Sequence, residues 1–116
     1  EIDFSFTSDG DLICLHDWQN SFTARFGFVP EAPVSLAEFQ KLLQDNGLQN
    51  CTLSTLADWL RQNPGKHIIT DVKDDNLAAL TLIATRYPGL RDRIIPQAYQ
   101  PEEVAPIRAL GYPKVF

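Results

Sequence analysis

The sequence predicts an α/β fold with parallel strands, and more specifically part of a (β/α)₈ TIM barrel, about its strands two to five. Strand-like and helix-like runs alternate along most of the chain, which is typical of βαβ units. Residues 1–7 and 114–116, at the two ends, both have strand character. Because such a barrel needs roughly 250 residues, we expect residues 1–116 to form a single partial barrel domain, truncated at both ends.

The first fifteen residues predict a β-hairpin. Apolar and polar side chains alternate over residues 1–7, which is the period of a strand with one polar face. Residues 8–11 read Ser-Asp-Gly-Asp, a combination that favours a turn. The apolar run 12–15 then predicts a second strand, which ends directly before His16 and Asp17.

A long loop and two helices are predicted next. Residues 18–34 contain aromatic residues and prolines without a clear period, which indicates a partly packed loop. Ser35 and Glu38 form a capping box before an apolar helical stripe that Asn46 and Gly47 end. A second helix is expected to open at Ser54 and to close at the Asn-Pro-Gly run that follows it.

The second half predicts two further strand and helix units. Residues 67–73 read as a buried strand, and residues 75–87 as a helix stopped by a Pro-Gly pair. Residues 94–99 read as the next strand, and residues 101–111 as a helix that begins with proline and ends with glycine. Pro106 should shorten or kink that last helix, because proline removes a backbone donor.

Composition excludes several classes of function. The formal net charge of -5 argues against nucleic-acid binding, which usually requires a basic face. A small phosphodiester substrate remains compatible, since a divalent metal can override the local field. No apolar run reaches the roughly 18 residues of a transmembrane segment. Cys14 and Cys51 show no metal-binding spacing, and we expect buried thiols. Neither the compartment nor the oligomeric state follows from the sequence.

Acidic side chains on the strands are the main functional signal. Glu1 and Asp3 are two residues apart on a strand, so their carboxylates share one face and need a cation or a shared proton. Asp71 and Lys73 repeat this spacing on a later strand. Three carboxylates suit Mg²⁺ or Ca²⁺, and the lysine suits a phosphate oxygen. From spacing alone, solvent-facing acids and a surface ion pair are an equally good interpretation.

Four other side chains are weaker candidates. His16 follows an apolar strand, where it could transfer protons or serve as a structural hydrogen-bonding group. Gln97 and Tyr99 alternate on a predicted strand and could contact substrate, although hydrogen-bonded packing is the more frequent role of such residues. Trp18 could line a pocket for an alcohol or acyl group, or belong to the small core of its own loop.

Taken together, these residues resemble the motifs of the glycerophosphodiester phosphodiesterase family. Residues 1–3 read Glu-Ile-Asp and lead through an Asp-Gly turn to an apolar strand and His16-Asp17. Residues 71–73 read Asp-Val-Lys and resemble a later Glu-x-Lys motif of the family. The resemblance covers residues 1–73, and beyond them only the order of strands and helices is similar.

The resemblance implies a barrel of the phospholipase C-like phosphodiesterase type and a metal-dependent hydrolysis of glycerophosphodiesters to glycerol phosphate and an alcohol. It implies that Glu1, Asp3 and Asp71 are metal ligands, that Lys73 contacts phosphate, and that His16 is one of two acid/base histidines. The family's other histidine precedes the Glu-x-Asp strand. We therefore expect the isolated chain to show no appreciable activity.

Two alternatives remain open. Aspartate at position 71, where the family generally has glutamate, matches the related sphingomyelinase D-type phospholipases. That relationship would imply a lysophospholipase D-type activity on lipid headgroups. The second alternative is a scaffold that binds a phosphodiester without cleaving it.

Overall fold

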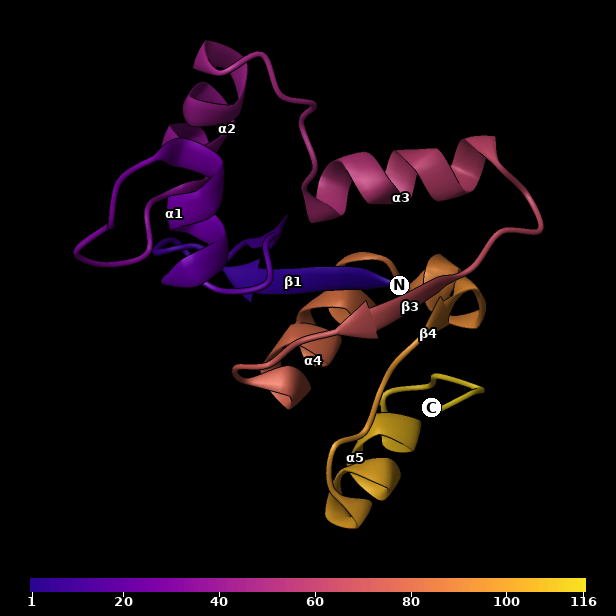
Figure 1. Ribbon diagram of the computed structural model, residues 1–116. Coiled ribbons are helices and arrows are strands. Elements are labelled where there is room, and N and C mark those ends of the chain that lie inside the picture. Colours follow the sequence, from indigo (N-terminus) through magenta and orange to yellow (C-terminus); the bar gives the residue numbers. More distant parts are fainter.

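The chain forms one mixed sheet of four strands with helices packed against it in a computed structural model of residues 1–116 (Figure 1). The strands are β1 (Ile2–Phe6), β2 (Leu12–Cys14), β3 (Ile68–Asp71) and β4 (Ile94–Ile95), in the spatial order β2-β1-β3-β4. β1 and β2 pair in antiparallel orientation, as the predicted hairpin requires. β3 lies parallel to both β1 and β4.

The predicted barrel architecture is wrong. The structure is a small, compact α/β domain with an open sheet, and 116 residues are too few for eight strand and helix units. The physical reason lies at β2, which occupies the outer side of β1 in antiparallel orientation. The chain itself covers the far edge of β2, where Ile13 forms an isolated bridge with Thr52. A barrel of parallel strands cannot continue past such an edge.

Five α-helices and two 3₁₀ helices connect the strands. The α-helices are α1 (Asn20–Phe26), α2 (Leu36–Asp45), α3 (Leu53–Gln62), α4 (Asn76–Arg86) and α5 (Val104–Ala109). The 3₁₀ helices are η1 (Pro88–Arg93) and η2 (Pro101–Glu103). No helix has both the length and the apolar character needed to cross a membrane.

Most of the predicted helix ends are close to the observed ones. Ser35 caps α2 by accepting a hydrogen bond from the backbone N–H of Glu38, as the capping box predicts. The N-cap of α3 is Thr52, two residues before the expected Ser54. The predicted helix 101–111 is divided into η2 and the short α5, which contains Pro106.

α1 lies within the segment that was predicted to be a loop. Its signals are local, because Asp17 accepts hydrogen bonds from the N–H groups of Asn20 and Ser21. At the other end Gly27 adopts a left-handed conformation, with φ of 81°, and closes the helix onto the carbonyl of Thr23. No apolar period marks so short a helix, so aromatic content alone suggested a packed loop.

Two hydrophobic clusters hold the domain together. The larger cluster packs the inner face of the sheet against α3, α4 and α5, through residues that include Phe4, Ile68, Leu60, Leu80 and Ile107. The smaller cluster packs α1 and α2 against the other face of β2, through Ile13, Leu15, Phe22, Phe39 and Leu43. Figure 1 shows α1 and α2 side by side near the hairpin, well away from α5.

Two further sequence predictions differ from the structure. Cys14 and Cys51 are not free thiols but form a disulfide with a Cα–Cα distance of 5.4 Å. Residues 114–116 do not form an assigned strand. Nevertheless, the backbone N–H of Phe116 donates to the carbonyl of Pro96, and the N–H of Ala98 donates to the carbonyl of Phe116. These two bonds pair Phe116, the last residue of the predicted strand, with the segment after β4.

The disulfide should stabilise the domain measurably. It joins residues 37 positions apart, and closing a loop of that size should stabilise the fold by roughly 4 kcal/mol relative to the open chain. We expect Cys14→Ser with Cys51→Ser to lower the free energy of unfolding by a comparable amount, measured by urea denaturation. A Ser35→Ala control, which removes only the α2 cap, should cost about 1 kcal/mol. Equal losses from the two variants would contradict this expectation.

Candidate functional site: an acidic cluster beside a polar cleft

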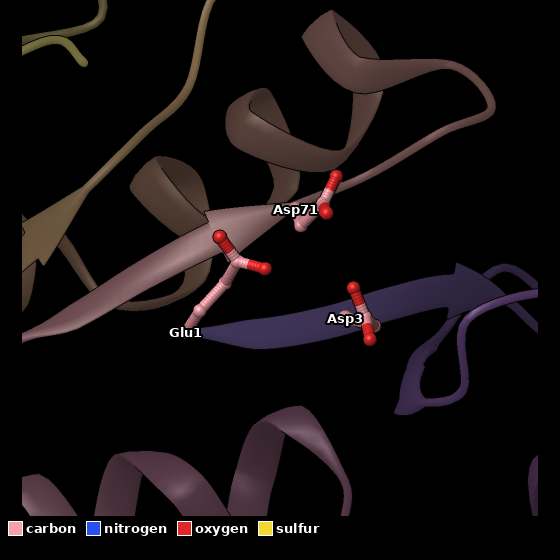
Figure 2. A group of neighbouring side chains, drawn as sticks. All are labelled: Glu1, Asp3 and Asp71. Carbon is pink, nitrogen blue, oxygen red and sulfur yellow. The ribbon is translucent and has the colours of Figure 1, made fainter.

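Glu1, Asp3 and Asp71 lie together on the outer face of the sheet. Each offers a carboxylate oxygen, and these oxygens all lie within 4.8 Å of one another. The pairing of β1 with β3 is responsible, since it places Asp3 directly beside Asp71 in the parallel register. Figure 2 shows the three side chains projecting from the two neighbouring strands, with Glu1 and Asp71 extending toward the same space.

Asp71 is the least exposed acid of the cluster and the one with most partners. Lys73 Nζ donates to both of its carboxylate oxygens, at 2.6 and 2.7 Å. The hydroxyl of Tyr99 donates to Asp71 Oδ1 and accepts a hydrogen bond from the N–H of Val72. Burial opposes ionisation of Asp71, but the Lys73 and Tyr99 hydrogen bonds outweigh it and lower the pKa of this carboxyl.

Asp3 titrates in the opposite direction. Burial and the neighbouring Asp71 carboxylate raise the pKa of Asp3 above its usual value, and Glu1 adds to that repulsion. The carboxylates of Asp71, Asp3 and Glu1 in turn raise the pKa of Lys73. One ammonium group therefore faces three carboxylates, which leaves an excess of negative charge on this face of the sheet.

Gln97 and Tyr99 hold the cluster from the segment that follows β4. Gln97 Nε2 donates to Glu1 Oε2 at 3.2 Å and to the carbonyl of Thr70 at 2.9 Å. Tyr99 also lies close to Lys73, whose ammonium nitrogen is 5.6 Å from the ring centroid. Burial and the Asp71 carboxylate raise the pKa of the Tyr99 phenol, so it remains a donor. Both residues support the acids, but not from a strand, because the predicted strand 94–99 ends at Ile95.

His16 lies at the other side of the site and has a defined orientation. Its Nδ1 atom is 2.8 Å from Asp17 Oδ2. Hydrogen bonds from the backbone of Ser21 and from His16 lower the pKa of Asp17 to about 2, so this carboxylate can only accept. The Nδ1–H of His16 must therefore donate, which leaves Nε2 free to accept a proton in the neutral ring. The role of Asp17 was not predicted, although it directly follows His16 in the sequence.

A cleft of about 310 Å³ lies beside His16. Its walls include His16, Trp18 and Lys73. Trp18 Nε1 donates to the carbonyl of Phe6 at 3.0 Å, and the indole packs against Phe22 of the smaller cluster. The structure thus brings the predicted lysine, histidine and tryptophan to one cleft, and Lys73 links this cleft to the carboxylate cluster through its hydrogen bonds to Asp71.

Neutralising the two aspartates should have opposite effects on stability. Asp3 has a raised pKa, so its ionised form destabilises the fold as the pH rises through that range, and Asp3→Asn should stabilise the metal-free protein at pH 7 by up to about 1 kcal/mol. Asp71 has a lowered pKa, so its contribution is complete above the ordinary value and is lost as the pH falls through the lower one. Asp71→Asn should therefore destabilise at pH 7.

Urea denaturation with a chelator present, at pH 7 and at pH 3, measures both effects. At the lower pH the Asp3→Asn effect should disappear, because Asp3 is then already protonated. A destabilising Asp3→Asn at pH 7 would show that the carboxylates do not repel one another.

Comparison with family models, with curated proteins and with solved structures finds no match to this chain. Its candidate site therefore rests on its own residues and their geometry.

Proposed function

We propose that this chain binds a divalent metal and a phosphodiester, as part of a hydrolase that cleaves glycerophosphodiesters to glycerol phosphate and an alcohol. The observation that carries the proposal is the convergence of Glu1, Asp3 and Asp71 from two strands onto one point. The resemblance of the motifs to glycerophosphodiester phosphodiesterases adds the substrate class. The open sheet means that this support comes from the site residues and not from a shared barrel.

The residues present fit a hard cation. Glu1, Asp3 and Asp71 offer only oxygen ligands, which Mg²⁺ and Ca²⁺ prefer. The pKa of Asp3 is raised first by burial and then by repulsion from Asp71, and a bound cation would offset both effects by favouring the ionised carboxylate. A bound cation of this kind supplies charge stabilisation to the phosphoryl oxygens during displacement at phosphorus.

Lys73 and His16 supply two further groups that the proposed reaction uses. The Lys73 side chain is 51% exposed and lines the cleft, so its ammonium group is available to a phosphate oxygen. His16, held by Asp17 through Nδ1, presents Nε2 for proton transfer to or from an oxygen of the substrate. In the glycerophosphodiester phosphodiesterase family, which the motifs resemble, a second histidine shares this proton transfer. The expectation that residues 1–116 alone show no appreciable turnover follows from this need for two histidines.

The lipid-directed alternative has one specific observation in its favour. Trp18 lines the cleft, and its ring continues into a cluster of aromatic side chains that includes Phe22 and Phe39. Such an apolar wall suits a lipid headgroup that is still attached to its acyl chain. Asp71, the residue that departs from the glycerophosphodiesterase pattern, favours the same alternative.

Metal binding is the first test. Mn²⁺ titration followed by electron paramagnetic resonance should give a single site, and Asp3→Asn or Asp71→Asn should weaken it by at least about tenfold. Asp92→Asn is a matched control, because Asp92 is an exposed aspartate on η1. Equal affinity in all four proteins would rule out the carboxylate cluster as the metal site.

Phosphodiester binding next to that metal is the second test. Bound Mn²⁺ should broaden the ³¹P signal of glycerophosphocholine, and Lys73→Met should remove the broadening while Mn²⁺ affinity is retained or increased, because Asp71 loses a competing ammonium group. Lys114→Met, at an exposed position, is the control.

The outcomes of this test separate the candidates. Selective broadening of lysophosphatidylcholine would favour the lipid-directed alternative, and broadening of neither would exclude both. Turnover by the isolated chain at the 1–10³ s⁻¹ of ordinary enzymes, an order-of-magnitude range, would contradict the division of proton transfer between two histidines.

A further inference from the structure

The disulfide closes the one segment that carries His16. Cys14 is the last residue of β2, and Cys51 directly precedes Thr52, the cap of α3. The segment between the two cysteines contains His16, Asp17, α1 and α2, together with most of the smaller hydrophobic cluster. The bridge therefore joins the start of this segment to its end.

His16 is positioned by this segment and not by the larger cluster. Its ring contacts Asp17, which the first N–H groups of α1 hold in place. The nearest link to the sheet is at Leu15, whose N–H donates to the carbonyl of Asp3 and whose carbonyl accepts from Ser5 Oγ. The acids, by contrast, lie on or next to β1 and β3, which pack on the larger cluster.

The non-covalent ties of the segment lead mainly to the hairpin. Asp9 Oδ1 accepts from the N–H of Leu36, and Trp18 Nε1 donates to the carbonyl of Phe6. The disulfide instead leads to α3, whose Leu53 and Leu60 belong to the larger cluster. The disulfide thus adds a covalent crosslink between the two ends of this segment, where β2 and α3 meet and the N–H of Cys14 donates to the carbonyl of Cys51.

We propose that the Cys14–Cys51 disulfide positions His16 relative to the carboxylate cluster, so that opening the bridge displaces His16 while Glu1, Asp3 and Asp71 keep their arrangement. The proposal rests on the proposed function only for the catalytic value of His16. The position of the His16 ring relative to the carboxylates can be tested without substrate.

The bridge is accessible to a reductant. Both cysteines are partly exposed, and together with Arg25 they line a cleft of about 320 Å³. Dithiothreitol would deliver two electrons and two protons, so that the S–S bond breaks, two thiols form and the reagent closes to its own cyclic disulfide. Arg25 donates a hydrogen bond to the carbonyl of Cys14. Its positive charge favours the cysteine thiolate that is released when dithiothreitol attacks the bridge.

The chain contains two histidines, which gives the experiment an internal control. In protein labelled with ¹⁵N-histidine, long-range ¹H–¹⁵N spectra report the tautomer and surroundings of each ring. On reduction with dithiothreitol, the His16 signals should shift because the ring moves relative to the carboxylates, while the Nδ1–H pattern imposed by Asp17 within the same segment is retained. The signals of His67, which directly precedes β3 and lines a cleft with Cys51, should change less than those of His16.

Two double variants control for a direct effect of dithiothreitol on the spectrum and for unfolding. Cys14→Ser with Cys51→Ser, and Cys14→Val with Cys51→Ala, should both reproduce the spectrum of the reduced protein. Unchanged His16 signals would overturn the proposal, and so would the joint loss of the His16 and His67 signals in both variants, since the bridge would then hold the whole domain.

The same samples separate this proposal from the proposed function. Mn²⁺ affinity should be equal in the oxidised and reduced proteins, because the three carboxylates lie outside the bridged segment. A shift of His16 without any metal binding in either state would support the positioning role and reject the proposed function. Metal binding with an unmoved His16 would support the proposed metal site and reject the positioning role of the disulfide.

Discussion

The parallel pairing of β1 with β3 is the constraint on which the site depends. Asp3 and Asp71 are partners in that register, and Ile2 is paired with Thr70. Because side chains alternate between the faces of a strand, a slip of one residue would turn Asp71 into the apolar interior and Val72 out of it. The buried Phe4, Ile68 and Val72 prevent such a slip. The packing of the inner face thereby fixes the arrangement of acids on the outer face.

This arrangement brings like charges together at a cost to the fold. Lys73, Tyr99 and Gln97 reduce the cost by donating to Asp71 and Glu1, while Asp3 receives no such help and has a raised pKa. A domain that needed only stability would have little reason to keep Asp3 ionisable at this point. This imbalance is the physical basis of the proposal that a cation binds there.

Much of the local structure could be predicted, because each signal is contained in a few adjacent residues. The hairpin follows from alternation and the Asp-Gly turn, and the α2 boundaries follow from Ser35 and from Asn46 with Gly47. The approach of Asp3 to Asp71 was foreseen only by comparison with known motifs, since no local signal specifies which strands become neighbours.

The open sheet was not foreseen, because its termination at β2 depends on the Ile13 and Thr52 bridge between segments far apart in sequence. The disulfide was missed for the same reason, and Asp17 was missed because its role depends on the turn into α1.

The covering of β2 has a further consequence, which concerns association between molecules. An uncovered edge strand exposes a row of N–H and C=O groups that can pair with a strand of another chain and begin aggregation. Here the N–H of Cys14 donates to the carbonyl of Cys51, and the adjacent bridge occupies Ile13. The residues that tie down the segment after α2 therefore also protect the apolar strand Leu12–Cys14 from intermolecular β-pairing.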